Sequence, residues 1–240
     1  MTNRITKTVL FDLDGTLLDS MRIFNDIVLF NLDRSGVDKT KGSMDKIGIQ
    51  LLETNQASQT NTGVILIFQI FWRIGRSFRL SRIKSFLFAI RCLSKVKEVY
   101  KNALLFPNTK KSLEKLVESG YCLGICTSAS RDQMTLTLKK HDIIQLFHPG
   151  ALISRDDVTN LKPAPEGIFL AINACSAQAK DGFFLGDMPV DMIAGDRAGL
   201  TTIGLTTGLV NRELLLRYSS PSIVLDSIEE ATEWILNSSK

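Results

Sequence analysis

Two aspartates one residue apart are the side chains of this sequence best suited to chemistry. Asp12 and Asp14 follow the apolar residues 9–11, and Gly15 ends the segment. An apolar run bounded by glycine predicts a buried strand, in which residues i and i+2 point the same way. Two adjacent carboxylates repel one another and are costly to bury, so we expect a divalent cation, Mg²⁺, beside them. Two solvated aspartates at a strand end are the alternative.

Two further segments place polar groups after or between expected elements. Thr127 and Ser128 follow an expected strand at 121–126 and precede a helix, where a hydroxyl and free amides can bind an anion. Lys162 lies among prolines that we expect to hold residues 161–166 extended and to fix where the lysine points. Taken alone, the first is a capped turn and the second is a surface lysine.

A fourth group is acidic. Asp187 and Asp191 follow an expected strand at 183–185, and by themselves they are surface acids at the start of a helix. Together with the other segments, however, they complete a set of carboxylates, a hydroxyl and a lysine. This set contains a nucleophile, metal ligands and a cation for phosphate oxygens, which are the groups that phosphoryl transfer requires.

The elements that must position these groups alternate between strand and helix after Pro107. Ser130 and Gln133 predict a capping box at the start of one helix, and Pro165 suits the first position of another. The expected strands lie at 121–126, 151–154, 183–185, 202–205 and 223–225. Such alternation predicts a parallel sheet with ligands at the carboxyl ends of its strands, and therefore an α/β fold.

The region 18–104 shows helical periodicity without strand alternation. Apolar residues between 23 and 30 predict an amphipathic helix that ends near Gly36, the polar residues 54–63 predict a loop, and residues 64–101 predict two or three helices. Because this region follows the first strand end directly, we expect it to lie over the site.

The motifs, in this order, resemble those of the haloacid dehalogenase superfamily in its phosphatase branch, and the C-terminal stretch resembles phosphoglycolate-phosphatase-like members. The resemblance covers residues 8–16 and about 105–240 and rests on DLDGT, TS, KPAP and GDMPVD. It implies a Rossmann-like core at 1–17 and 105–240, with an inserted all-helical cap domain at 18–104. A second aspartate at Asp14 separates the chain from the dehalogenases, and DLDGT differs from the DKTGT of the ATPase branch.

The resemblance also implies catalytic roles. Asp12 would attack phosphorus in line and form an aspartyl-phosphate, and Asp14 would protonate the leaving oxygen and then activate water. Asp12, the backbone carbonyl of Asp14 and Asp187 would hold Mg²⁺. A carboxylate attacks a dianionic phosphate only if a metal and a lysine offset the repulsion, so Lys162 is implied as a catalytic residue.

Binding and supporting roles follow from the same motifs. Thr127, the amide of Ser128 and Lys162 would bind the phosphoryl oxygens. Asp191 would lie near the metal or orient Lys162. Thr16, together with Asp19, would shape the turn into the cap.

The predicted function is a Mg²⁺-dependent phosphatase acting on a small phosphorylated metabolite. A phosphomutase acting on a sugar phosphate shares the motifs and is one alternative. A membrane-associated or partner-binding protein that uses its basic helices is the other.

The positive charge is concentrated in one segment. Residues 64–101 carry nine basic residues and one acidic residue, a net charge of +8 in a chain whose total is +4. We expect a packed cap helix with a solvated basic face. A basic funnel for an anionic substrate and a membrane-surface or partner-binding helix are the alternatives, and no motif indicates nucleic-acid binding.

The four cysteines show no C-x-x-C pair and predict buried, reduced thiols. The polar N-terminus reaches the first expected strand within eight residues, which leaves no room for a signal peptide. Both observations predict a cytoplasmic protein. The composition does not indicate an oligomeric state.

Overall fold

The computed structural model of the chain describes residues 6–38, 47–50, 53 and 64–238. The chain divides into two compact units. One unit comprises Met1–Asp19 and Leu104–Lys240, and the other comprises Ser20–Ala103. The two connections between them run side by side, because Asp19 N donates to Leu104 O at 2.8 Å and Phe106 N donates to Leu17 O at 3.0 Å.

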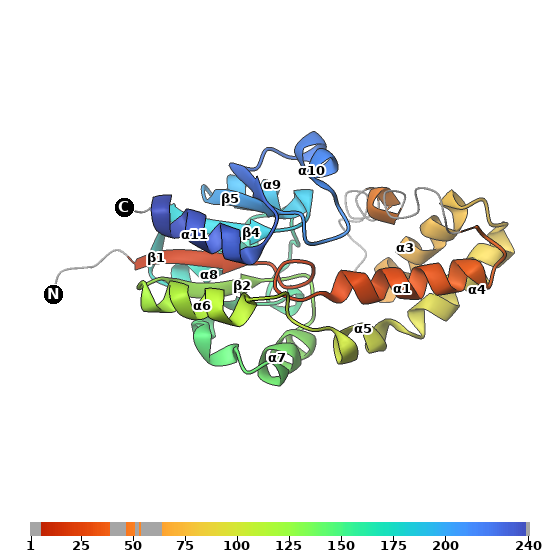
Figure 1. Cartoon of the computed structure of the whole chain (residues 1–240), viewed down its shortest axis with the longest axis horizontal. Helices are drawn as coiled ribbons and strands as arrows, with labels where there is room; N and C mark the ends of the chain where they lie inside the picture. The colour runs from red at the N-terminus through yellow and green to blue at the C-terminus, as the bar shows by residue number, and fades with distance from the viewer. Residues whose placement is uncertain (1–5, 39–46, 51–52, 54–63, 239–240) are drawn as a thin grey trace. The chain divides into compact units, whose positions relative to one another are not determined.

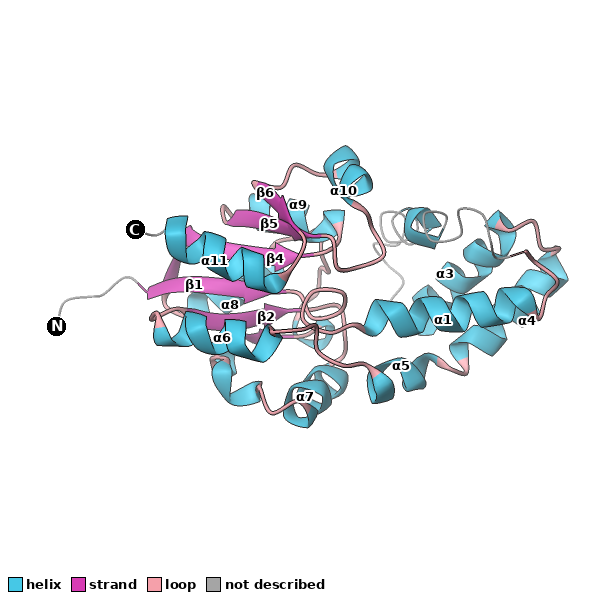
Figure 2. Ribbon diagram, in the orientation of Figure 1, coloured by secondary structure: helices cyan, strands magenta, loops and turns pink. Residues whose placement is uncertain are grey.

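Six parallel strands form the centre of the first unit (Figure 2). They are β1 (Thr6–Phe11), β2 (Cys122–Cys126), β3 (Leu152–Ile153), β4 (Ala177–Gly186), β5 (Thr201–Leu205) and β6 (Ile223–Leu225). Their order across the sheet is β3-β2-β1-β4-β5-β6, and every neighbouring pair is parallel. The expected α/β fold is therefore confirmed. The strand order reverses between β1 and β4, which is where sheets of this kind bind their ligands.

Helices cover both faces of this sheet (Figure 1). The helices of the first unit are α6 (Thr109–Glu118), α7 (Arg131–Lys140), α8 (Glu166–Ala174), α9 (Pro189–Arg197), α10 (Arg212–Tyr218) and α11 (Ile228–Ser238). The side chains of successive residues in β4 point to opposite faces of the sheet, as expected for a strand. The ring of Phe183 lies 6.2 Å from that of Trp234 in α11, whereas Phe184 belongs to a core cluster with Ile168 of α8 and Ala194 of α9.

The expected capping box at the start of α7 is confirmed. Gln133 N donates to Ser130 Oγ at 3.3 Å, and Ser130 N donates to Gln133 Oε1 at 3.2 Å. This cap fixes the point at which the chain leaves β2 and turns into α7. Thr127 and Ser128 lie within that connection.

Two of the four cysteines form a disulfide, so the expectation of four reduced thiols is wrong. Cys122 at the start of β2 is bonded to Cys175 at the end of α8, because the strand and the helix pack side by side. Cys92 and Cys126 are free and buried, and burial raises the pKa of each thiol to about 12. Disulfides are rare in reducing compartments, so the cysteines no longer support a cytoplasmic location.

The second unit is helical. It contains α1 (Ser20–Asp33), α3 (Val64–Ser77), α4 (Arg82–Leu93) and α5 (Val96–Asn102). Residues 64–101 thus form three helices as expected, while the loop expected at 54–63 lies outside the described residues. Within the part of the chain that the structure describes, no helix is long and apolar enough to span a bilayer.

Close packing holds α3 and α4 together as a helical hairpin. A Cβ on Gly75 of α3 would lie 3.2 Å from atoms of both Ser85 and Phe88 in α4, so the glycine allows the helices to approach. The rings of Phe24 in α1 and Phe71 in α3 are stacked at 5.2 Å. These contacts give the second unit an apolar core of its own.

Candidate active site

The first two aspartates lie beyond the end of β1 rather than within it. Asp12 N donates to Leu185 O at 2.8 Å, which extends the pairing with β4 by one residue. The chain then turns at Gly15, whose φ is +81° and whose N–H donates to Leu18 O at 2.9 Å. Strand alternation therefore ends at Phe11 and does not set the direction of Asp14. Asp14 is half-buried. Burial raises the pKa of Asp12, and the charge of Asp14 adds to this rise.

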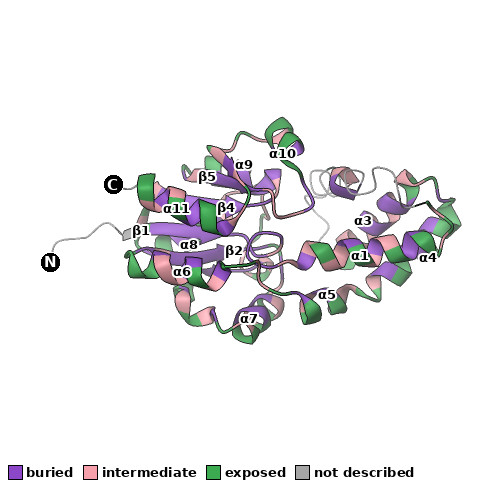
Figure 3. Ribbon diagram, viewed as in Figure 1, coloured by how far each residue is buried: buried purple, intermediate pink, exposed green. Residues whose placement is uncertain are grey.

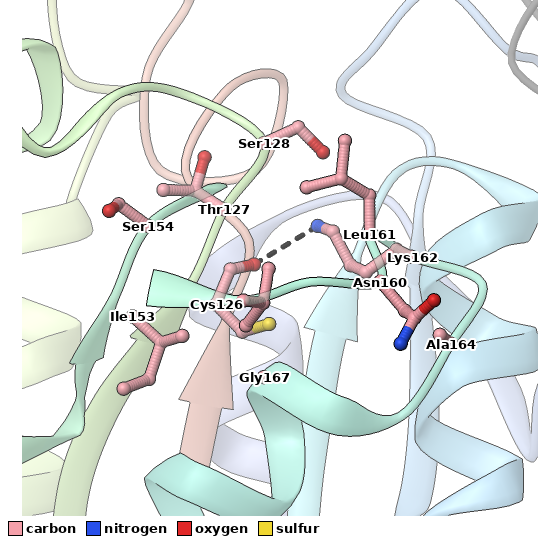
Figure 4. A pocket seen from close by; sticks show the side chains of 11 residues that line it. Cys126, Thr127, Ser128, Ile153, Ser154, Asn160, Leu161, Lys162, Ala164 and Gly167 are labelled. Carbon is pink, nitrogen blue, oxygen red and sulfur yellow. Dashed lines mark hydrogen bonds between the residues drawn. The ribbon is translucent and has the colours of Figure 1, made fainter. Parts of the chain in front are cut away.

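Lys162 is the centre of the hydrogen-bond network at this edge of the sheet. Its Nζ lies 2.5 Å from Asp12 Oδ1, 2.6 Å from Asp191 Oδ1 and 3.0 Å from the carbonyl oxygen of Cys126 (Figure 4 shows the last bond). An ammonium group has three N–H donors, so each of them has an acceptor here. The lysine side chain is only 6% exposed. It thus links the ends of β1 and β2 with α9.

The segment that carries Lys162 is a turn, and the expectation of an extended segment at 161–166 is wrong. Ala164 N donates to Leu161 O at 2.9 Å. Glu166, the first residue of α8, folds the segment back by accepting hydrogen bonds from Thr159 N and Asn160 N, both at 2.8 Å. These hydrogen bonds lower the pKa of Glu166. The prolines restrict the segment, but Glu166 anchors its start.

Three buried carboxylates converge beside Lys162. Asp12, Asp187 and Asp191 each offer an oxygen, and these oxygens lie within 4.8 Å of one another. Burial raises the pKa of Asp12 to about 7, against the opposing attraction of Lys162. Burial and the charges of Asp191 and Asp12 raise the pKa of Asp187 well above its ordinary value. For Lys162, burial lowers the pKa but the two ion-paired acids outweigh this effect and raise it.

The charge balance of this cluster suits a divalent cation. Three carboxylates face one lysine, so the ionised cluster carries an excess of two negative charges. Hard divalent cations prefer carboxylate oxygens and would offset that excess. The buried acidic cluster is therefore consistent with a metal site. Among the described residues it comprises Asp12, Asp187 and Asp191, and the carboxylate of Asp14 is not part of it.

Asp187 lies between two glycines, Gly15 and Gly208, which belong to different segments of the chain. A Cβ on Gly15 would lie 2.4 Å from Asp187 Oδ2, and a Cβ on Gly208 would lie 1.8 Å from the same atom. Thr16 Oγ1 donates to Asp187 Oδ1 at 3.4 Å. Thr207 Oγ1 donates to Gly15 O at 2.5 Å and joins the two segments. Any larger side chain at either glycine would displace the carboxylate.

Asp191 is fixed by its own helix as well as by Lys162. Its Oδ2 accepts from Met188 N at 3.0 Å, which caps the start of α9. A Cβ on Gly186 would lie 2.4 Å from Asp191 Cβ, so the glycine before Asp187 makes room for the second acid. Asp191 thus has one oxygen on the backbone and the other on Lys162. This geometry orients the lysine.

Thr127 and Ser128 line a small pocket together with Lys162 (Figure 4). Thr127 is buried, and its Oγ1 accepts from Ala129 N at 3.1 Å, which leaves its hydroxyl hydrogen available to a ligand. Ser128 is exposed. Asn160, whose backbone and side chain both donate to Glu166, also lines the pocket.

Sequence reasoning missed three residues of this site. Thr207 and Gly208 follow β5, and the rule that polar groups follow strand ends could have identified them. Glu166 lies in the same segment as Lys162, but its hydrogen bonds to residues six and seven positions earlier have no local signal. Their contribution became apparent only from the folded arrangement.

The family model for "Haloacid dehalogenase-like hydrolase" matches residues 9–205 of the chain. The pyrophosphatase PpaX of Bacillus velezensis is 27% identical over 232 residues, which are 96% of each chain. The phosphoglycolate phosphatase of Haemophilus influenzae is 30% identical over 126 residues, 52% of this chain and 55% of the relative. A crystal structure of a predicted phosphoglycolate phosphatase from Haemophilus somnus superposes with a TM-score of 0.71 at 21% identity and covers 98% of each chain.

The six-stranded parallel sheet has a helical insertion after its first strand, and its acids gather at the carboxyl ends of β1 and β4, which places an α/β fold with a candidate site at the switch point of its sheet. The chain belongs to the haloacid dehalogenase-like hydrolases.

Proposed function

We propose that the chain is a Mg²⁺-dependent phosphatase that hydrolyses a small phosphomonoester through an aspartyl-phosphate. The observation that carries the proposal is the buried contact of Lys162 with Asp12 and Asp191, next to Asp187. A carboxylate beside a lysine and a divalent-cation site is suited to attack a dianionic phosphate. The phosphatases among the similar proteins support the same reaction class.

In the first step, a carboxylate oxygen of Asp12 forms a bond to phosphorus while the bond from phosphorus to the leaving oxygen breaks. Asp14 donates a proton to that oxygen. Lys162 offsets the repulsion between the nucleophile and the phosphoryl oxygens. Because its three donors already have acceptors, the lysine must exchange at least one of these bonds for a phosphoryl oxygen as substrate binds.

In the second step, Asp14 takes a proton from a water molecule whose oxygen attacks phosphorus. The bond between phosphorus and Asp12 breaks, which releases phosphate and restores the carboxylate. Thr127 and the backbone amide of Ser128 would bind phosphoryl oxygens from the β2 side of the site. Asp191 keeps Lys162 in place throughout, because its second oxygen is held by the backbone of Met188.

Asp12 and Asp187 would hold the metal ion together with the backbone carbonyl of Asp14. When bound, Mg²⁺ would supply positive charge for the phosphoryl oxygens and lower the pKa of its carboxylate ligands. The glycines on both sides of Asp187 keep that carboxylate in a fixed position. We propose that Thr16 supports it and that residues 18–104 form the cap that selects the substrate.

The substrate class is tested by release of inorganic phosphate in the presence of Mg²⁺. A suitable panel contains p-nitrophenyl phosphate, 2-phosphoglycolate, a hexose phosphate and inorganic pyrophosphate, the last because PpaX relatives match most of the chain. The proposal predicts fastest turnover with a phosphomonoester. Preferred hydrolysis of pyrophosphate, or conversion of a sugar phosphate to its isomer without free phosphate, would contradict it.

The site is tested by the Asp12→Asn variant, which keeps the shape of the side chain and removes the nucleophilic charge. Turnover should fall at least about a thousandfold, in keeping with the loss of covalent catalysis. Asp196→Asn is the matched control, because Asp196 is an exposed aspartate on α9. Equal activity in Asp12→Asn and the control would defeat the assignment.

A further inference from the structure

The helix α4 of the second unit exposes a stripe of large apolar side chains. Ile83, Phe86, Leu87 and Ile90 are 75%, 50%, 45% and 45% exposed. Their spacing of three, four and seven residues places them on one face of the helix. Green segments alternate with purple along α4 in Figure 3, in keeping with one exposed and one buried face. Isolated exposed apolar residues are ordinary, but a continuous stripe marks an interaction surface.

Among the residues that the structure describes, packing within the unit accounts for only part of this stripe, through the ring contact between Phe86 and Phe68 of α3. The buried residues of α4 are Ser85, Phe88, Ala89 and Cys92, and they form a different face. Gly75 of α3 approaches that buried face at Ser85 and Phe88. The hairpin therefore already has its apolar contact, and the exposed stripe is additional apolar surface.

Basic residues border the stripe on both sides. At about 100° of rotation per residue, the four apolar side chains cover an arc of roughly 100°. Arg82 lies next to one edge of the arc, and Lys84 and Arg91 lie next to the other, and all three are exposed. Residues 64–97 contain eight basic residues and no aspartate or glutamate. The surface therefore combines an apolar centre with positive edges.

We propose that the α4 stripe and its basic border bind an anionic lipid surface. Apolar side chains flanked by lysine and arginine are typical of helices that lie in the membrane interface, where the chains insert and the cations meet the headgroups. The helix has 12 residues, too few for the ~20 that would span a bilayer, so it lies on the surface. A two-fold contact between two copies would bring the same positive edges together, which favours lipid over a second copy.

The stripe extends toward α3. The ring of Phe68 lies 5.5 Å from that of Phe86, and Ile65 at the start of α3 is 61% exposed. This aromatic pair holds Phe86 in place at the edge of the hairpin. The contact area available to lipid is thus larger than α4 alone.

Sedimentation with large unilamellar vesicles tests the proposal on the whole chain. Vesicles of phosphatidylcholine alone are compared with vesicles that also contain phosphatidylserine. The variant Ile83→Gln/Phe86→Gln should bind at least about tenfold more weakly to the anionic vesicles, because two apolar side chains no longer insert. Leu136→Gln/Leu216→Gln is its matched control, since both leucines are exposed and lie in the first unit.

The charged border is tested separately. Lys84→Gln/Arg91→Gln should bind about 25-fold more weakly, at about fivefold for each basic residue near an anionic surface. The control is Lys111→Gln/Lys139→Gln, which removes the same charge from exposed positions of the first unit. Circular dichroism of each variant verifies that the exposed substitutions leave the fold intact.

We expect the parent protein and both controls to bind anionic vesicles, and both α4 variants to bind them more weakly. Failure of the parent protein to bind, or equal binding by the α4 variants and their controls, would overturn the proposal. So would a dimer in light scattering that Ile83→Gln/Phe86→Gln dissociates, without vesicle binding by the parent. That outcome would assign the stripe to a second copy of the chain.

Discussion

Replacing Lys162 by methionine would remove the positive charge that Asp12 and Asp191 share. Methionine preserves much of the length of the side chain without its charge. The lysine side chain is buried, as are both of its partners. Breaking such a pair costs about 3–5 kcal/mol when the remaining charge cannot be neutralised. Asp12 can be neutralised by taking up a proton, so we expect the cost to depend on pH.

The direction of that dependence follows from the pKa of Asp12. Burial raises it from 3.8 to about 7, although Lys162 opposes the shift. A carboxyl group whose pKa is higher in the folded protein than in the unfolded protein stabilises the fold fully at a pH below its unfolded pKa. This stabilisation is lost as the pH rises to its folded pKa. Without metal ions, the contribution of Asp12 should therefore fall by roughly 4 kcal/mol between pH 3.8 and about pH 7, and then level off.

In Lys162→Met the pKa of Asp12 should lie above 7, because the lysine is the group that lowers it. The free energy of unfolding of the variant should therefore continue to fall above pH 7, by about 1.4 kcal/mol per pH unit. Over the same range, the contribution of Asp12 in the parent protein should stay level. The free energies of unfolding of the variant and the parent should differ least at low pH and most at high pH.

Urea unfolding followed by circular dichroism in EDTA, at several pH values on both sides of pH 7, would measure this difference. Lys139→Met is the control, because Lys139 is exposed on α7 and its removal should shift the curve little at any pH. Unfolding free energies of variant and parent that run parallel above pH 7 would refute the reasoning. Lys162 would then not be the group that keeps Asp12 ionised.

Three further outcomes follow from the structure. Gly208→Ala should displace Asp187 and reduce kcat/KM at least about a hundredfold, while the circular dichroism spectrum stays unchanged. A fully active variant would show that Gly208 does not confine the Asp187 carboxylate. Glu166→Gln should lower kcat about tenfold, because it weakens the hydrogen bonds that anchor the segment before Lys162, and unchanged kinetics would deny it that role. Reducing the disulfide, whose cysteines are 53 residues apart, should lower the unfolding free energy by up to about 4 kcal/mol in urea, and Cys122→Ser/Cys175→Ser should not respond to reductant.

The fold could be predicted from local patterns because each pattern has a local physical cause. The Ser130 capping box and the apolar runs of the strands occur where they were expected. Boundaries depend on pairing, however, and β4 begins at Ala177 because that residue pairs with Thr6, well before the apolar run at 183–185. Pro165 is the N-cap of α8 rather than its first residue.

Side-chain environments were harder to predict than elements. In α8, Ile168 and Ile172 are buried, but Phe169, the apolar residue next to Ile168, is 45% exposed. Ala171 takes the buried position instead, since the adjacent core cluster accepts a small residue there. Apolar periodicity predicts the helix, whereas the shape of the surface against which the helix packs decides which of its residues are buried.

The candidate site could be located because parallel strands end at one edge of a sheet. That rule brings Asp12 and Asp187 near one another without any knowledge of their contacts, whereas Lys162 lies in a turn well beyond the end of β3. It cannot show that Glu166 anchors the turn, that Gly208 confines Asp187, or that a disulfide forms. Those features depend on contacts between distant segments, which have no signature in the local sequence.

The central claim is that the Asp12 carboxylate attacks phosphorus, and trapping the covalent product tests it most directly. Asp14→Asn should slow the second step, which needs a base, while p-nitrophenolate can leave without a proton from that residue. After incubation with p-nitrophenyl phosphate and Mg²⁺ and an acid quench, peptide mass spectrometry should find one phosphoryl group on Asp12. A phosphoryl group on another residue, or turnover by the parent protein with no adduct at Asp12 in either protein, would contradict the account.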